Sequence, residues 1–334
     1  MPALLRATPR GAGIALPQRR QVMMFQFLIG RLAQSVPVLI GVSLVSFFAI
    51  HLVPGDPIQI MTLGRATPET VARLHAELGL DRPLWQQYLS FVGNALRGDL
   101  GRSIVQKAPI SEIIADGMAV SLYLLAYGAA LSVVIAVPLA MWAAVRRDRA
   151  PDHAIRLVGM VGFAMPPFWI GLVLMVMFGL TLGWFPIRGF GEGAIGHLYH
   201  MFLPALTIAL FLAPLLIQSL RSAILDVLEA DYIEVARAKG LSARRVLAKH
   251  VLRNAAIPVV TVLAVNIGWL VSGAVIVEQV FSIHGLGAQL VRSVSYRDYP
   301  TVQGLALVFA VIVMAVNLLA DFAYTLIDRR VARS

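Results

Sequence analysis

Apolar residues gather in six long runs, and shorter polar segments separate the runs. The runs extend approximately over Leu32–Leu52, Met118–Ala144, Leu157–Trp184, Met201–Leu220, Val259–Phe281 and Leu305–Ile327. Each is close to or above the length of about 20 residues with which a helix spans the hydrocarbon of a bilayer. Helices of a soluble core are usually shorter and keep a polar stripe. The pattern therefore predicts an all-α, polytopic membrane protein with six transmembrane helices.

Prolines stand inside or beside several of these runs, at Pro37, Pro138, Pro166, Pro167, Pro204 and Pro214. Membrane helices tolerate proline where neighbouring groups satisfy the backbone carbonyls that it frees. Such kinks suit a protein that flexes or lines a cavity, and ordinary helix packing explains them about as well.

The longest polar segment, residues 53–117, lies between the first two runs. The order of residues in Thr67–Glu69 fits an N-cap, a first-turn proline and an acidic residue, and Gly79 fits the end of that helix. A second helix is expected to begin at Asp81–Pro83. A segment of this length folds alone only marginally, so we expect it to pack on the membrane domain.

Composition and charge agree with a membrane location and indicate its orientation. Hydrophobic residues make up 58% of the chain and charged residues 14%, the mean hydropathy is +0.78, and the net charge is +10. Most of the 28 Lys and Arg lie in the N-terminal segment, in two of the connections and in the C-terminal tail. The positive-inside rule then places both termini in the cytoplasm and residues 53–117 outside. This orientation explains the excess of basic residues, so a nucleic-acid partner is not needed to account for the net positive charge.

The N-terminal residues 1–24 contain arginines but no acidic residue, and they are rich in Pro, Gly and Ala. They lack an apolar core long enough for a signal peptide. We predict a disordered cytoplasmic arm here, followed by one membrane domain over residues 25–334.

Motifs of familiar enzyme classes are absent from the sequence. It contains no G-x-x-x-x-G-K-[ST] phosphate loop, no H-E-x-x-H and no G-x-S-x-G. It also has no cysteine, which excludes disulfides and thiolate metal sites. His197 and His200 are three positions apart, but a solvated pair at the membrane interface explains them better than a metal site. The sequence therefore predicts no catalytic residue, cofactor or metal, and no enzyme activity.

Polar side chains within the apolar runs are candidates for a translocation pathway, because they are costly to place in a membrane. They are Gln218, Asn266, Glu278, Asn317 and Asp321. Hydrogen bonds between helices would account for them equally. The residues alone leave both interpretations open.

Residues 222–258 form a charged segment between the fourth and fifth runs. Apolar residues at helical spacing predict a helix that ends near Lys239, and Gly240 fits the left-handed position after a helix end. Ser242 is a plausible N-cap for a second helix, and Pro258 suits the start of the fifth run. The segment is therefore predicted to be a helical hairpin. Basic residues at the lipid headgroups would explain its charge, whereas the small residues Ala236 and Ala238 before the glycine favour contact with another protein.

This hairpin resembles the EAA loop of permease subunits of ABC importers. The similarity lies in Glu234–Ala236, Gly240 and Ile257–Pro258, with Val235 where the motif name implies Ala. Further segments are similar to the B-type permease of dipeptide, oligopeptide and nickel importers. They are PGDP at Pro54–Pro57, LGLDRPLWQQY at Leu78–Tyr88, GDLGRS at Gly98–Ser103, EQVFSIHGLG at Glu278–Gly287 and RDYPTVQG at Arg297–Gly304. His284 departs from the family pattern, which usually has Pro there.

The resemblance implies a type I ABC importer permease fold and partners that lie on other chains. These would be a second permease that completes the pore, two cytoplasmic ATP-binding subunits and an extracytoplasmic solute-binding protein, in a bacterial inner membrane. Di- or oligopeptides fit the resemblance best as the solute, but importers of nickel and glutathione use the same type of subunit, so the solute stays open. The hairpin would couple to the ATPases through Glu234, Val235, Ala236, Arg237, Lys239, Gly240 and Pro258.

Two other classes of protein are alternatives to a permease subunit. A self-sufficient secondary transporter or channel would need an ion or proton site inside the membrane, for which Asp321 and Glu278 are the candidates. An intramembrane enzyme would need a paired nucleophile and base, and the predicted spans contain none.

Overall fold

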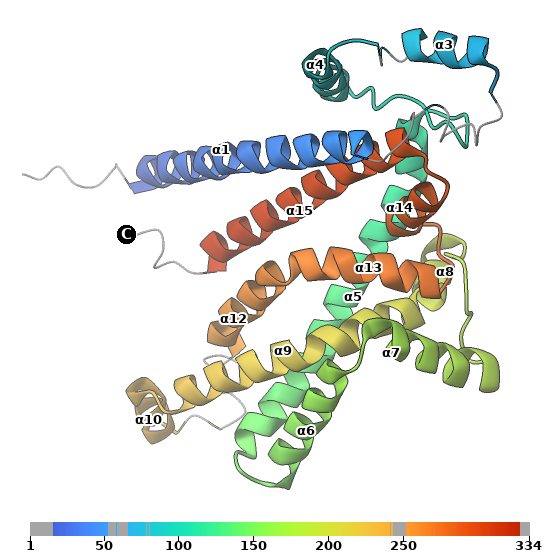
Figure 1. Cartoon of the computed structure of the whole chain (residues 1–334). Helices are drawn as coiled ribbons and strands as arrows, with labels where there is room; N and C mark the ends of the chain where they lie inside the picture. Colours follow the sequence, from blue (N-terminus) through green and yellow to red (C-terminus); the bar gives the residue numbers. More distant parts are fainter. Residues whose placement is uncertain are drawn as a thin grey trace, which may run out of the picture.

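The computed structural model describes residues 16–52, 58, 66–77, 79, 81–240, 242 and 252–327, and these residues are almost entirely helical. The elements in chain order are α1 (Leu16–His51), α3 (Pro68–Glu77), α4 (Leu84–Leu96), α5 (Ile110–Val145), α6 (Ala150–Ala164), α7 (Pro167–Leu174), the π-helix η1 (Met175–Thr181), α8 (Gly193–His200), α9 (Phe202–Leu228), α10 (Asp231–Ala238), α12 (Leu252–Val265), α13 (Ile267–Val280), α14 (Leu286–Ser295) and α15 (Tyr299–Ile327). Figure 1 shows their arrangement. The prediction of an all-α protein is confirmed for this part of the chain.

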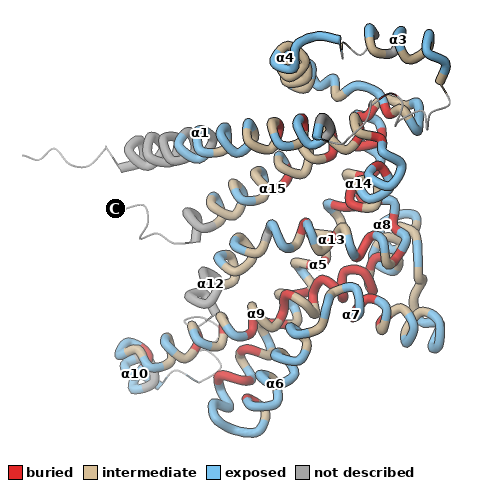
Figure 2. The backbone as a smooth tube through the Cα atoms, viewed as in Figure 1, coloured by how far each residue is buried: buried red, intermediate tan, exposed pale blue. Residues whose placement is uncertain are grey.

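Helices α5 and α9 form the centre of the fold, and each contains more buried residues than any of the other described helices (Figure 2). On α5 the contact surface is made of small residues such as Ala136 and Ala140, which pack against Leu212 and Leu216 of α9. A Cβ on Gly128 would lie only 2.8 Å from the Ile208 side chain. Small residues let membrane helices approach closely, so this pair is the rigid element on which the others pack.

The third predicted span is broken into two arms. Helix α6 ends at Ala164, α7 begins at Pro167, and the two directions differ by 104°. Met165 is extended, as expected for a residue that precedes a proline, and neither Pro166 nor Pro167 can donate a backbone hydrogen bond. The break therefore follows from the two adjacent prolines.

The fifth predicted span is broken as well, at Asn266. The stretches Val259–Val265 and Gly268–Val280 differ in direction by 65°. Helix α12 already begins at Leu252, so Pro258 lies inside the helix beyond its first turn and does not mark a helix start. The start that the sequence predicted for this helix, at Pro258, is therefore later in the chain than the observed start of α12 at Leu252.

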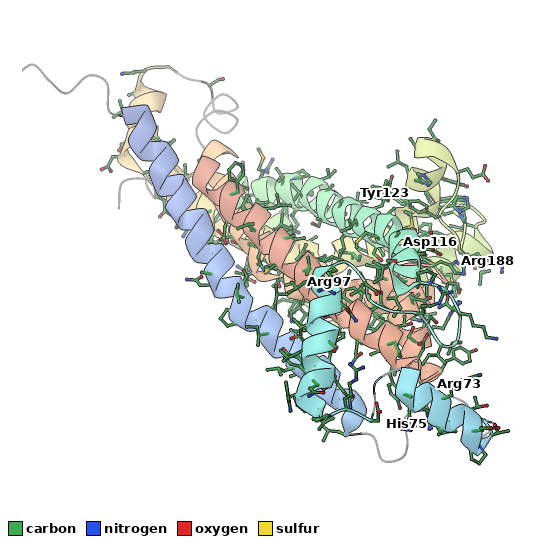
Figure 3. The ribbon with its side chains drawn as sticks, turned by 90° about the horizontal axis from the view of Figure 1, so that it is seen from above. Arg73, His75, Arg97, Asp116, Tyr123 and Arg188 are labelled. Atoms are coloured by element: carbon green, nitrogen blue, oxygen red, sulfur yellow. The ribbon has the colours of Figure 1, made fainter. Side chains whose placement is uncertain are left out.

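Helices α1 and α15 run side by side, as both the front view and the view from above show (Figures 1 and 3). Helix α1 begins at Leu16, so residues 16–24 of the expected arm are helical, while residues 1–15 lie outside the described part. Near the other end of α1, the Ser43 hydroxyl lies 2.8 Å from the Tyr88 hydroxyl, which joins α1 to α4.

The segment between the first two predicted spans contains the two short helices that the sequence predicted. Thr67 precedes α3, and its hydroxyl accepts a hydrogen bond from the backbone N–H of Thr70 at 3.3 Å. Gly79 follows α3 with a φ of +65°, and α4 begins directly after Pro83. The capping signals in the sequence therefore identified both helix starts.

Among the described residues, three helices are long and apolar enough to cross a membrane, and the two broken pairs bring this to five. The apolar part of α1, Ala33–Ala49, is shorter than these. The all-helical, multi-span architecture is thus confirmed, whereas the number of six spans stays a prediction.

Candidate functional site: the hairpin after helix α9 and the polar residues of the spans

Helix α10 follows directly on α9, the most buried helix of the fold. Glu229 and Ala230 form the turn between them, and the backbone N–H of Ile233 donates to the Ala230 carbonyl at 2.9 Å. Asp231 and Glu234 lie in the first turn of α10, where negative charge is favourable at a helix N-terminus. A force on α10 therefore acts directly on the end of α9.

The two faces of α10 differ in burial. Ile233 is fully buried, whereas Glu234 is exposed and Val235 keeps 53% of its surface exposed. Ala236 and Arg237 belong to the helix by backbone, but their side chains lie outside the description. A short charged helix that shows apolar surface beyond the central bundle is typical of a protein contact site.

The helix ends as the sequence predicted. The backbone N–H of Lys239 donates to the Val235 carbonyl at 3.1 Å, and Gly240 follows with a φ of +79°. This left-handed conformation is accessible to glycine at little cost. The predicted second helix of the hairpin falls on residues 243–251, which lie outside the described residues.

Glu278, a candidate for the pathway, lies buried where α5, α13 and α14 meet. The Ser121 hydroxyl donates to one carboxylate oxygen at 2.6 Å, and the Ala288 N–H donates to the other at 2.9 Å. Ser121 in turn accepts the N–H of Leu286 at 2.8 Å. A Cβ on Gly285 would collide with this carboxylate. Glu278 therefore holds the N-terminus of α14 against α5 and α13.

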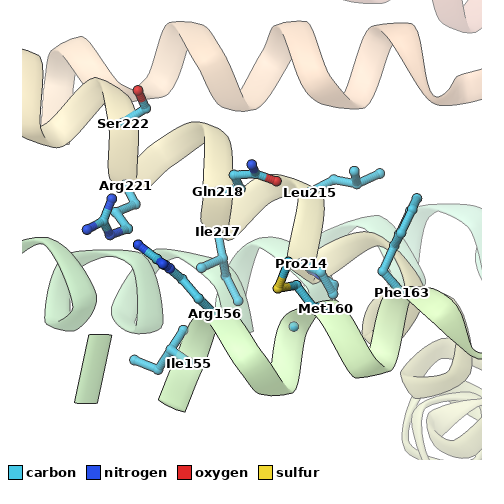
Figure 4. A pocket seen from close by; sticks show the side chains of 11 residues that line it. Ile155, Arg156, Met160, Phe163, Pro214, Leu215, Ile217, Gln218, Arg221 and Ser222 are labelled. Carbon is cyan, nitrogen blue, oxygen red and sulfur yellow. The ribbon is translucent and has the colours of Figure 1, made fainter. Parts of the chain in front are cut away.

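The other four polar candidates lie at separate places. Asn317 and Asp321 line a cleft of about 810 Å³ between α1, α13 and α15, where Asp321 pairs with Arg31 at 3.1 Å. Gln218 lines a crevice of about 480 Å³ between α6 and α9 (Figure 4). Asn266 donates to the Val262 carbonyl of its own helix at 2.8 Å. Within the described residues, the five candidates do not form one continuous site.

An ion pair that sequence reasoning missed joins α6 to α9. Both carboxylate oxygens of Asp152 accept hydrogen bonds from the Arg221 guanidinium, each at 2.6 Å, and the Asp152 side chain is fully buried. In the sequence, Arg221 is one of many basic residues that the positive-inside rule explains. The only signal was an acidic residue in the first turn after Pro151, which is equally typical of an ordinary helix start.

Asp298 is a second buried carboxylate that sequence reasoning passed over. It accepts hydrogen bonds from the Ser103 hydroxyl, from the Ile104 N–H at 3.3 Å and from the Thr301 hydroxyl at 2.8 Å. It thus caps the start of α15 and fixes the end of the segment that contains α3 and α4. Ser103 and Asp298 lie in two of the family-like motifs, which was the available signal.

Replacing Asp298 with alanine is expected to loosen the segment around Ser103. The substitution leaves the hydroxyls of Ser103 and Thr301 and the Ile104 N–H without their acceptor, which costs about 1–3 kcal/mol for each buried group. Trypsin added outside spheroplasts should then cut faster after Arg102 and Lys107. Asp81→Ala, which removes an exposed carboxylate, serves as the control. Equal cleavage of Asp298→Ala and the native chain would show that this contact does not hold the loop.

His197 and His200 hold the connection that precedes α8. Their Nδ1 atoms lie 3.0 Å from the Phe190 carbonyl and 3.2 Å from the Arg188 carbonyl, respectively. His197 also stacks on Phe190 and contacts Tyr123, which projects from α5 (Figure 3). Both imidazoles therefore have a structural role, and no group of three possible metal ligands occurs among the described residues.

The bundle of spans and the hairpin beyond α9 define a multi-pass membrane transport subunit. The chain belongs to the family described as binding-protein-dependent transport system inner membrane component, whose model matches residues 136–333. A model for the N-terminal part of the same membrane component matches residues 24–124. The resemblance of the EAA-like hairpin and the outer motifs to this family is confirmed. The chain is thus a permease subunit of an ABC importer in a bacterial inner membrane, and not an enzyme.

Curated relatives match almost end to end. The dipeptide transport system permease protein DppB of Escherichia coli K12 is 36% identical over 335 residues, which cover 92% of this chain and 99% of the relative. A putative peptide transport system permease protein of Brucella melitensis is 37% identical, and the oligopeptide transport system permease protein AppB of Bacillus subtilis is 36% identical, with the same coverage.

A solved structure shows the same fold. The inward-facing MetNI methionine ABC transporter contains a chain that superposes with a TM-score of 0.54 at 16% identity, covering 65% of this chain and 96% of that one. A second crystal form gives a TM-score of 0.52. The type I importer permease fold is thereby confirmed.

Proposed function

We propose that this chain is one of two permeases in an ATP-driven importer of di- or oligopeptides. The observation that carries the proposal is α10, which follows directly on the central helix α9 and exposes Glu234 and Val235. The names of the relatives DppB and AppB support peptides as the solute.

In this proposal, α10 receives the movement of two cytoplasmic ATPases. ATP binding closes the ATPase pair and shifts α10 together with the end of α9. Because α9 packs along most of α5, the shift reaches the membrane bundle as a movement of whole helices. Such rigid-body rearrangement between packed helices is the usual basis of alternating access.

A second, related permease supplies the other half of the pathway, and an extracytoplasmic binding protein delivers the solute. The termini face the cytoplasm, and the segment with α3 and α4 faces the binding protein. Asn317 and Asp321 are the candidates for solute contact, because they border the larger cleft. Glu278 and Asn266 are better explained by helix packing, since their polar groups are used within the bundle.

A self-sufficient secondary transporter is the second candidate, because Asp321 faces a cleft between α1, α13 and α15. Its carboxylate pairs with Arg31 at 3.1 Å, which neutralises the charge that would bind an ion. Glu278 is held by Ser121 and Ala288. The geometry therefore favours the ATP-driven importer.

Reconstitution separates the two candidates. Liposomes that contain the chain with its second permease, its ATPases and its binding protein are expected to accumulate a labelled dipeptide only when ATP is supplied. Unlabelled di- and tripeptides should compete, whereas glutathione and nickel should not. Uptake by the chain alone under an ion gradient would contradict the proposal, and competition by nickel or glutathione but not by peptides would contradict the assigned solute.

A further inference from the structure

The ion pair between Asp152 and Arg221 lies at the base of α6, close to the hairpin. Arg221 is in the last two turns of α9, and its side chain is 15% exposed, while that of Asp152 is fully buried. Two parallel hydrogen bonds between a guanidinium and a carboxylate fix both position and orientation. The pair therefore sets the angle at which α6 meets α9.

The loop before α6 strengthens this connection. The N–H of Asp148 donates to Asp152 at 2.9 Å, and Asp148 itself has a φ of +58°. On the surface, Arg147 forms an ion pair with Glu229, the residue that starts the turn from α9 into α10. The Asp148 contact fixes this loop to the start of α6, and the Arg147–Glu229 pair ties the loop to the end of α9.

Packing alone leaves α6 room to move. The crevice of about 480 Å³ opens between α6 and α9 next to the pair, and Arg221 of α9 and Arg156 of α6 reach toward each other at its end (Figure 4). Within the lining of the crevice, the helices approach at Gly159, where a Cβ would lie 3.6 Å from Pro214. The ion pair is therefore the specific contact that holds the base of α6.

The other end of α6 is a bend. The helix stops at Ala164 and the chain turns by 104° into α7, across the two adjacent prolines. Helix α7 packs on α9 and α13. Helix α6 is thus an arm with a break at one end and the ion pair at the other, so a change at the base alters its angle to the rest of the bundle.

We propose that the Asp152–Arg221 ion pair is a positioning link, which makes α6 follow α9 when α10 is displaced. The inference rests on the proposed function, in which ATPases move α10. When the base of α9 shifts, Arg221 carries Asp152 and the start of α6 with it. The inner half of the third span then moves with the hairpin, and the Pro166–Pro167 break takes up the change in angle.

The test uses the assembled transporter and the double variant Asp152→Ala with Arg221→Ala. Removing both partners leaves no buried unpaired charge, so folding is retained. Solute taken up per ATP hydrolysed is expected to fall about tenfold, the range of a typical coupling between sites. Arg221→Lys keeps the positive charge but loses the two parallel hydrogen bonds of the guanidinium. Its solute uptake per ATP hydrolysed should therefore lie between that of the native chain and that of the double variant. The control Arg149→Gln removes an exposed charge at the start of α6 and should leave the ratio unchanged.

A distance measurement separates positioning from a merely structural role. Because the chain contains no cysteine, single cysteines at Leu157 and Asp226 can be spin-labelled without background from this chain. In the native chain the distance between the labels should stay constant when a non-hydrolysable ATP analogue is added. In the double variant it should change or broaden.

The proposal is overturned if the double variant takes up as much solute per ATP hydrolysed as the native chain and the distance between its two spin labels stays constant. Failure of the proposed function is distinguishable, because the native assembly would then show no ATP-dependent uptake at all.

Discussion

Replacing Gly240 with valine is expected to abolish most solute uptake while the assembled transporter continues to hydrolyse ATP. Gly240 has a φ of +79°, and an L-residue in the left-handed region costs roughly 1–2 kcal/mol, with β-branched residues among the least tolerated. No atom of the described residues lies within 4 Å of the position that a Cβ would take, so among them the cost is conformational and not a clash. The turn would relax, α10 would lose its orientation, and uptake per ATP should fall about tenfold.

Two further variants sharpen this experiment. Gly240→Asn should retain much of the uptake, because asparagine tolerates the left-handed region better than other residues. Gly98 has a similar φ of +81° but precedes the Asp99 turn on the opposite side of the membrane domain, so Gly98→Val should leave the uptake-to-hydrolysis ratio intact. Membrane insertion of all three variants is checked by their amount in the membrane fraction. Normal uptake by Gly240→Val would show that the shape of this turn is not what couples the subunits.

Local signals in the sequence predicted the elements well. The N-cap Thr67, the stop at Gly79 and the helix end before Gly240 depend on residues within one or two turns of each other, and each lies where expected. The spans follow from length and apolar composition, which also act locally. These features were predictable because no distant contact competes with them.

Features that depend on distant residues were not predictable in the same way. Pro166 and Pro167 indicated a kink, but the 104° bend also depends on how α7 packs on α13. Asp152 and Arg221 are 69 residues apart in sequence, and each has an ordinary local explanation. Their pairing follows only when α6 packs on α9.

The acidic residues of the predicted spans also depend on distant residues for their role. Glu278 and Asp321 were equivalent as costly polar residues in apolar runs. In the fold, one carboxylate is enclosed by hydrogen-bond donors of α5 and α14, and the other faces a cleft beside Arg31. The difference lies in which helices surround each residue, and a single sequence does not contain that information.

Replacing Glu278 with leucine is expected to destabilise the assembled transporter strongly. The change removes the acceptor for the Ser121 hydroxyl and for the Ala288 N–H, both at a junction where the carboxylate is 1% exposed. Leaving such buried donors unsatisfied costs about 1–3 kcal/mol each, so a loss of roughly 3 kcal/mol is expected. Thermal unfolding of the purified complex in detergent measures it.

Controls distinguish the hydrogen-bond network from charge alone. Glu278→Gln keeps one acceptor for Ser121 but presents an amide N–H to the Ala288 N–H, so its loss should be intermediate. Glu112→Gln changes an exposed carboxylate on α5 and should have little effect. Ser121→Ala combined with Glu278→Gln should cost less than the sum of the single changes, because the two residues share one bond. Strict additivity would show that Ser121 and Glu278 act independently, and that the bond between them contributes nothing to stability.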